Sequence, residues 1–121
     1  MKKFIRSVGF ALKGISYAFA TQLNFRIQTF VALIAIAMGL YFNISASEWH
    51  WVTLCIALVL MMELFNTGVE ALVDLVSPGY NELAGRVKDV SAAAVLVVAL
   101  LTIITGAIIF LPKILLLIHA A

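Results

Sequence analysis

Two long runs without a charged side chain limit what this chain can fold into. One extends from Thr29 to Ile44 and the other from Val90 to Phe110. Because an α-helix rises 1.5 Å per residue, about 20 apolar residues cross the hydrocarbon core of a bilayer. The chain is 64% hydrophobic and 12% charged, and a soluble domain of 121 residues has too little interior to hide so much apolar surface. The sequence therefore predicts an all-α membrane protein.

The sequence predicts three such helices within a single domain that covers residues 1–121. Ser47 is placed to cap the second of them, because serine favours the N-terminal end of a helix. A polar connection at residues 77–89 separates the second helix from the third. The transmembrane helices are expected at about residues 25–44, 49–76 and 90–110.

The segment before the first span, residues 1–20, is amphipathic. Its apolar side chains recur at three- and four-residue steps, whereas Lys2, Arg6 and Lys13 lie away from them. We expect this segment to form a helix on the membrane surface, with its lysines near lipid phosphates. These basic residues predict a contact with anionic lipid, and no nucleic-acid partner is expected.

The distribution of basic residues predicts the orientation. Lysine and arginine gather in the N-terminal segment and in the connection at residues 77–89, whereas the turn at residues 43–50 has none. Basic loops are typical of the cytoplasmic side. We therefore expect a multi-pass protein of the cytoplasmic membrane with its N-terminus in the cytoplasm.

The second span contains a row of polar side chains at helical spacing. Its members are separated by three, four and four residues, which places them within about 80° of one helix face. A carboxylate at the centre of a bilayer costs roughly 2.5–3.5 kcal/mol on insertion scales. A row this unfavourable marks a candidate functional site, with a polar seam between packed helices as the alternative. The row consists of Glu63, Asn66, Glu70 and Asp74.

Two carboxylates with an asparagine between them fit a phosphoryl-transfer site, because Arg86, Lys88 and Asp89 are expected at the same membrane face. That chemistry uses a metal ion to neutralise phosphate oxygens, cations to hold them, and a base for the incoming hydroxyl. The sequence has no P-loop and no kinase catalytic-loop signature. An ion or proton pathway built from the same carboxylates stays open, as does a non-catalytic assembly subunit.

These residues also carry a resemblance. The pattern Glu63-x-x-Asn66-Thr67-x-x-Glu70-x-x-x-Asp74, followed by Gly85-Arg86-x-Lys88-Asp89, resembles the small bacterial membrane kinases of the diacylglycerol kinase and undecaprenol kinase family. The similarity extends over nearly the whole chain. It implies an ATP-dependent lipid kinase of the bacterial inner membrane. It also implies a homotrimer of subunits with a surface helix and three spans each, whose active sites are shared between neighbours.

The resemblance implies roles for individual residues. Glu63 would be the general base on the lipid hydroxyl, Asn66 would orient the reacting groups, and Glu70 would hold the Mg²⁺ that bridges the ATP phosphates. Asp74 would either pair with a cation such as Arg86 or take part in the reaction. The positions implied for the nucleotide are Lys3, Phe10, Gly79, Tyr80, Asn81, Lys88 and Asp89, and those for the lipid substrate are Asn24, Arg26 and Glu63.

Gln22 departs from the family pattern, which usually has a second glutamate here as the metal partner of Glu70. Glutamine still offers a carbonyl oxygen, but it removes one negative charge from a Mg²⁺ site, and hard divalent cations prefer carboxylates. The sequence leaves three explanations open: a weakened enzyme, an inactive homologue, or a metal held by Glu70 and the phosphates alone.

The acceptor lipid is predicted from pattern similarity alone. Three segments look more like the undecaprenol kinase branch than the diacylglycerol branch. We therefore expect undecaprenol as the acceptor, with diacylglycerol as the second candidate. The three segments are residues 40–45, 74–78 and 106–113.

Overall fold

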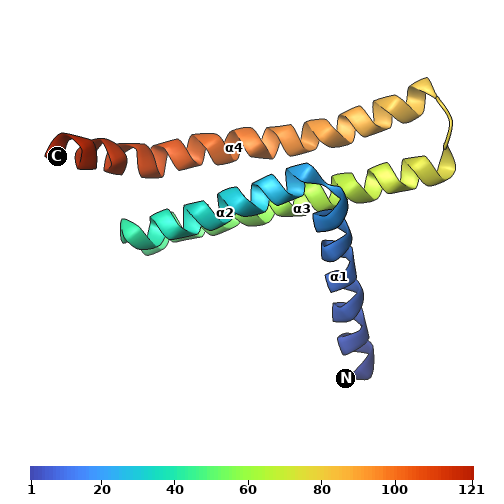
Figure 1. The fold of residues 1–121 in the computed structure, drawn as a ribbon, viewed down its shortest axis with the longest axis horizontal. Helices are drawn as coiled ribbons and strands as arrows, with labels where there is room; N and C mark the ends of the chain where they lie inside the picture. Colours follow the sequence, from blue (N-terminus) through green and yellow to red (C-terminus); the bar gives the residue numbers. More distant parts are fainter.

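The computed structural model describes all of residues 1–121 as four α-helices joined by short connections. Three of them run side by side, and the first leaves this bundle at a steep angle (Figure 1). Those three are long and apolar enough to cross a membrane. The predicted all-α membrane fold, with a surface helix and three spans, is confirmed. The helices are α1 (Lys2–Thr21), α2 (Leu23–Tyr41), α3 (Ala46–Val76) and α4 (Glu82–Ala120).

The corner between α1 and α2 forms at Gln22, whose extended backbone (φ −114°, ψ 109°) interrupts the helical path. Phe25 is buried in this corner, and its ring meets that of Phe19 edge to face with 6.4 Å between the centroids. Arg26 donates hydrogen bonds from Nη1 to the carbonyl oxygens of Phe19 (2.9 Å) and Ala20 (3.2 Å). These carbonyls belong to the last turn of α1, where they have no partner inside the helix. Arg26 therefore stabilises the angle at which α1 leaves the bundle.

A capping box begins α3. The Ser45 hydroxyl accepts a hydrogen bond from the Glu48 N–H, and the Glu48 carboxylate accepts one from the Ser45 N–H, both at 3.1 Å. Such a box requires a serine or threonine three residues before the acidic residue. Ser45 satisfies this spacing and Ser47 does not, so the prediction of Ser47 as the cap is wrong.

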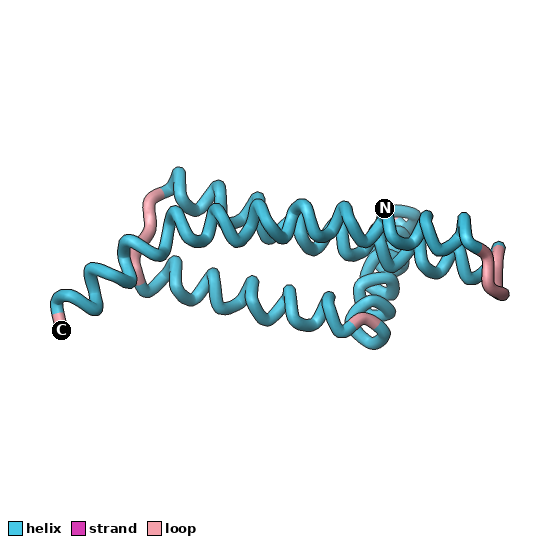
Figure 2. The backbone as a smooth tube through the Cα atoms, turned by 90° about the horizontal axis from the view of Figure 1, so that it is seen from above, coloured by secondary structure: helices cyan, strands magenta, loops and turns pink.

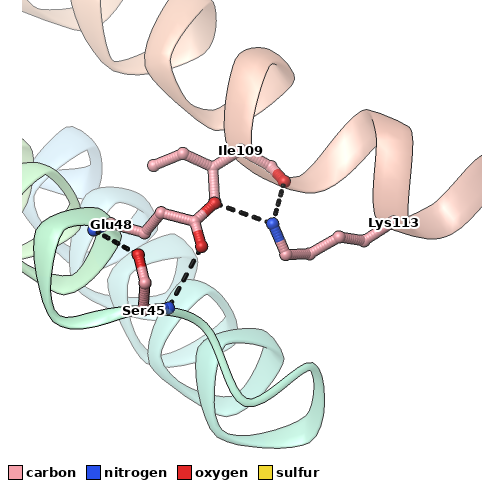
Figure 3. Close-up of polar contacts among 4 residues, drawn as sticks. All are labelled: Ser45, Glu48, Ile109 and Lys113. Atoms are coloured by element: carbon pink, nitrogen blue, oxygen red, sulfur yellow. Dashed lines mark hydrogen bonds and ion pairs between the residues drawn. The ribbon is translucent and has the colours of Figure 1, made fainter.

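The same glutamate joins the start of α3 to the far end of α4 (Figure 3). Lys113 Nζ lies 2.7 Å from Glu48 Oε2 and donates a second hydrogen bond to the Ile109 carbonyl oxygen at 3.0 Å. Ile109 also belongs to the small apolar core that closes this end of the bundle, together with Val52 of α3. The ion pair therefore lies beside the best-packed part of the molecule.

Lys113→Met is expected to lower the midpoint of thermal unfolding in detergent by a few degrees. Methionine keeps the apolar stem, but it leaves the Glu48 carboxylate without its cation and the Ile109 carbonyl without its second donor. The same substitution is also made in a Glu48→Gln background, where the ion pair is already absent. There the expected decrease in the unfolding midpoint is smaller. Equal losses in both backgrounds would contradict a stabilising role for the pair.

Close packing holds α2 against α3 next to this core. Gly39 is buried, and the Trp49 side chain lies directly over it. A Cβ atom at position 39 would come within 2.6 Å of Trp49 Cη2 and 3.1 Å of Ile44 Cδ1. Trp49 therefore packs between helices, whereas Trp51 is 53% exposed and free to face the lipid headgroups, where tryptophan is enriched.

Gly39→Ala is expected to destabilise the protein relative to Gly106→Ala. A Cβ at Gly106 meets no atom within 4 Å, so both variants gain the same helix propensity and only the first has a steric conflict. Overpacking of this kind costs about 1–3 kcal/mol. Unfolding by denaturant in mixed micelles measures the difference, and equal stabilities would contradict the packing described here.

α4 is longer at both ends than the sequence predicted. It begins at Glu82 and not near residue 90, because Asn81 Oδ1 accepts a hydrogen bond from the Ala84 N–H at 3.1 Å and caps the helix. It also continues through Pro112 to Ala120. Proline removes one helical hydrogen bond and bends a helix, but it does not have to end it. The last turns of α4 extend beyond the α2–α3 turn (Figure 2).

Candidate functional site

The inner part of the polar row predicted on α3 is buried in the bundle, together with the neighbouring Thr67. Glu63 is 1% exposed, and Asn66 and Thr67 are 6% and 5% exposed. Glu70, one turn further on, is half-buried, and Asp74 is exposed near the end of the helix. The row therefore runs from the interior of the bundle to its surface at the α3–α4 connection.

Hydrogen bonds within the row separate two kinds of carboxylate. Asn66 Nδ2 donates to Glu70 Oε1 at 3.3 Å. Neither carboxylate oxygen of Glu63 has a hydrogen-bond partner, and Asn66 Oδ1 is buried without one as well. A buried carboxylate without a partner is strongly disfavoured in a structural role, because nothing replaces its hydration. Glu63 is therefore available for chemistry, whereas Glu70 is held by its neighbour.

Asp74 pairs with Lys88 across the α3–α4 connection. Lys88 Nζ lies 2.6 Å from Asp74 Oδ1, and Arg86, suggested from the sequence as the partner of Asp74, lies 2.9 Å from Glu82 Oε1 instead. Arg86 and Glu82 are four residues apart on α4 and share one face of that helix. Of the two cations near the start of α4, Lys88 is thus the one directed toward the polar row.

A polar pocket of about 290 Å³ lies at this connection. Asp74 lines it from α3 and Lys88 from α4. The loop between them contributes Gly79, Tyr80 and Asn81, so four of the seven positions predicted for the nucleotide meet in one place. Tyr80 is 98% exposed, which leaves its ring free to contact a ligand.

The other predicted positions lie outside this pocket. Lys3 and Phe10 are exposed on α1, where Lys13 Nζ lies 5.6 Å from the centre of the Phe10 ring. Asp89 is exposed on α4, on the turn that also carries Lys88. Asn24, like Arg26, is exposed at the α1–α2 corner.

The oxygen atoms available for a metal ion are few. No group of three acidic, histidine or cysteine side chains comes together anywhere in the chain. Gln22 has one side-chain hydrogen bond, from Nε2 to Thr21 Oγ1 at 3.5 Å. The Glu70 carboxylate and the unpartnered Asn66 Oδ1 are hard oxygen donors, which suit Mg²⁺ when a nucleotide completes its coordination. The residues present therefore fit a magnesium ion brought with a nucleotide, and not a preformed metal cage.

A larger groove, of about 820 Å³, lies on the opposite side of α3 and is apolar. Ile15 and Phe19 of α1, Phe25 of α2 and Leu64 and Gly68 of α3 line it. These α3 positions face away from Glu63, because they lie at other angles around the helix. The groove is consequently not where the polar chemistry is placed.

Two features of the site were not anticipated from the sequence. Gln28, near the start of α2, has its Oε1 buried inside the bundle. Arg26, expected to face lipid, bonds the end of α1. The position of Gln28 on the same α2 face as Phe25 and Ala32, three and four residues away, is the pattern that indicates its burial.

Comparison with known proteins identifies the family. The protein-family model described as prokaryotic diacylglycerol kinase matches residues 9–110 of this chain. A diacylglycerol kinase of Synechocystis is 42% identical over 110 residues, which cover 90% of this chain and 63% of that protein. The chain thus spans less than two thirds of that relative. An undecaprenol kinase of Bacillus subtilis is 34% identical over 93% of this chain and 92% of its own length, and a diacylglycerol kinase of Escherichia coli K12 is 30% identical over 88% and 87%.

The match covers most of the chain and includes the polar row, the α3–α4 connection and Lys88. Three apolar helices and bacterial relatives together identify a multi-pass bacterial membrane protein. The chain belongs to the prokaryotic diacylglycerol kinase family of lipid kinases.

Proposed function

We propose that this protein transfers the γ-phosphoryl group of ATP to the hydroxyl of a membrane lipid alcohol at the cytoplasmic interface. The observation that carries the proposal is the polar pocket at the α3–α4 connection, which is lined by Asp74, the outermost member of the row of α3 side chains. From Asp74 to Glu63 the helix rises by about 16 Å. A nucleotide bound at the pocket directs its triphosphate along this face toward the buried carboxylate.

Each group of the row has a separate part in this scheme. Glu63, buried and without a partner, accepts the proton of the lipid hydroxyl as it attacks phosphorus. Lys88 contacts phosphate oxygens and leaves Asp74 to do so. Asn66 positions Glu70, and these two side chains would hold Mg²⁺ together with the nucleotide. Bound Mg²⁺ neutralises the charge that develops on the phosphate oxygens.

The remaining positions extend the site. We propose Gly79, Tyr80, Asn81 and Asp89 for the nucleoside, with Lys3 and Phe10 of the surface helix as further contacts. We propose Asn24 and Arg26, both exposed at the α1–α2 corner, as contacts for the headgroup of the lipid substrate. A homotrimer with shared sites supplies the surface helix of one subunit to the pocket of its neighbour, and the exposed apolar faces of α2 and α4 support such an assembly. The basic N-terminal segment supports a cytoplasmic N-terminus.

The acceptor we propose first is undecaprenol, on the pattern of residues 40–45, 74–78 and 106–113. Diacylglycerol is the second candidate, because the relative with 42% identity is named a diacylglycerol kinase. Both present a hydroxyl at the same interface and leave their tails in lipid, so the polar row serves either one.

The test is transfer of labelled phosphate from ATP to lipid in mixed micelles with Mg²⁺, each lipid being offered in turn. Transfer to one lipid supports the proposal and names the acceptor. If no labelled lipid forms while Glu63→Gln alters ion flux in vesicles, the protein is an ion pathway instead. If Glu63→Gln alters only the assembly state, the row belongs to an assembly subunit.

Gln22→Glu is expected to raise metal affinity, seen as a lower Mg²⁺ concentration for half-maximal transfer, by about 10-fold. The added carboxylate restores the negative charge that a hard divalent cation prefers. The size corresponds to about 1.4 kcal/mol of added interaction. Gln22→Asn, which changes length without adding charge, is the control. An unchanged Mg²⁺ dependence would show that Gln22 takes no part in metal binding.

A further inference from the structure

An apolar segment at the end of α4, residues 114–120, lies at the edge of the bundle and extends beyond it (Figure 2). Ile114 is its last side chain that packs against the small apolar core. The next four side chains are apolar and between 44% and 70% exposed. They are Leu115, Leu116, Leu117 and Ile118. The segment follows the region that matches the family model, which ends at residue 110.

The exposed side chains of this C-terminal segment cover every side of the helix. Successive residues of an α-helix are about 100° apart, so four in a row point in all directions around its axis. A protein partner covers one face of a helix, whereas lipid chains surround it. A helix that is apolar all round belongs in an apolar environment. Lipid therefore fits this segment better than a second copy of the chain does.

Two ion pairs between α3 and α4 indicate where the bilayer lies. Asp74 pairs with Lys88 at one end of the bundle, and Glu48 pairs with Lys113 at the other. At 1.5 Å per residue, about 39 Å of α3 and about 38 Å of α4 separate the two pairs. The hydrocarbon core of a bilayer is about 30 Å thick, and about 40–45 Å with its headgroup regions. The two pairs therefore match the two headgroup regions, and the C-terminal segment begins at one of them.

A bend keeps the C-terminal segment near this boundary. A straight helix would carry its seven residues about 10 Å further into water. Over its last turns, however, α4 turns away from the line of the bundle (Figure 2). Pro112 lies inside the helix just before the segment, and proline bends a helix because it removes one backbone hydrogen bond.

We infer that residues 114–120 are a membrane anchor that lies in the headgroup region of the leaflet opposite the polar pocket and inserts its leucine and isoleucine side chains among the acyl chains. No lysine, arginine, aspartate or glutamate occurs in the segment, so its partner is lipid hydrocarbon and not a particular headgroup charge. The anchor depends on the packing and length of α4, and it does not rest on the proposed function.

Nitroxide labels on single cysteines test the anchor in the full chain, reconstituted in phosphatidylcholine vesicles. Leu116→Cys and Ile118→Cys place labels on nearly opposite sides of the helix, in a Cys55→Ala background that leaves no other thiol. Collision with oxygen, which concentrates among acyl chains, is compared with collision with a nickel chelate that stays in water. Two controls are Ile108→Cys, where the side chain is 70% exposed within the charge-free run, and Ser47→Cys, exposed at the start of α3.

Both labels are expected to behave like the label at position 108, with a ratio of oxygen to nickel collisions several times that at position 47. Ratios as low as the one at position 47 would place the segment in water and overturn the anchor. Low collision rates with both reagents at one of the two positions would show a protein partner there, and would overturn it too. Circular dichroism checks that the labelled proteins keep their helix content, and Leu117→Cys repeats the measurement from a third side of the helix.

Discussion

Glu63→Gln is expected to lower kcat for phosphoryl transfer to lipid by about 10²- to 10⁴-fold, the range expected for loss of a general base. Glutamine keeps the shape of the side chain but has no carboxylate to accept the hydroxyl proton. Glu63 is 1% exposed and neither of its oxygens has a partner, so the fold does not compensate its charge. Replacing such a group with a neutral one is expected to leave the unfolding midpoint in detergent unchanged or to raise it.

Opposite changes in activity and stability distinguish a catalytic carboxylate from a structural seam. Glu82→Gln is the matched control, because Glu82 is exposed at the start of α4 and pairs only with Arg86 there. It is expected to change kcat by less than about twofold, as exposed ion pairs contribute little. A Glu63→Gln protein with the natural kcat and a lower unfolding midpoint would contradict the base and identify a polar seam between helices.

Helix number and type were predictable because membrane insertion depends on long apolar runs, which the sequence displays directly. Helix ends depend on single hydrogen bonds and were less predictable. Ser45 and Ser47 are both acceptable capping residues by type, and only the position of Glu48 decides between them. Asn81 similarly begins α4 earlier than the apolar pattern indicates, because a capped, charged first turn needs no apolar side chains.

The polar row on α3 was predictable because four residues on one helix share a face at fixed spacing. Contacts between helices were not. Asp74 had two nearby cations in the sequence, Arg86 and Lys88, and the rotation of α4 against α3 selects Lys88. The burial of Gln28 likewise depends on how α2 packs, and a glutamine near the end of a span is equally compatible with the membrane surface.

Lys88→Met is expected to raise the KM for ATP by about 10- to 100-fold, with a smaller effect on kcat. A charge-assisted hydrogen bond to a phosphate oxygen contributes about 1.5–3 kcal/mol, which corresponds to this range. Lys88 Nζ lies 2.6 Å from Asp74 Oδ1 in the pocket at the α3–α4 connection. Methionine therefore removes a cation and also leaves Asp74 unpaired, where its charge repels the phosphates.

The two consequences of Lys88→Met are separable. Asp74→Asn added to Lys88→Met removes the repulsion, and the double variant is expected to recover part of the affinity for ATP but not all of it. Arg86→Met deletes a positive charge two residues away, from a side chain that pairs with Glu82 outside the pocket, and is expected to leave the KM nearly unchanged. Initial rates over a range of ATP concentrations give these values. A direct phosphate contact depends on the position of Lys88 and not only on its charge. Equal increases in the KM for ATP in Arg86→Met and Lys88→Met would therefore contradict that contact and indicate that both cations act only through the electrostatic potential at the membrane surface.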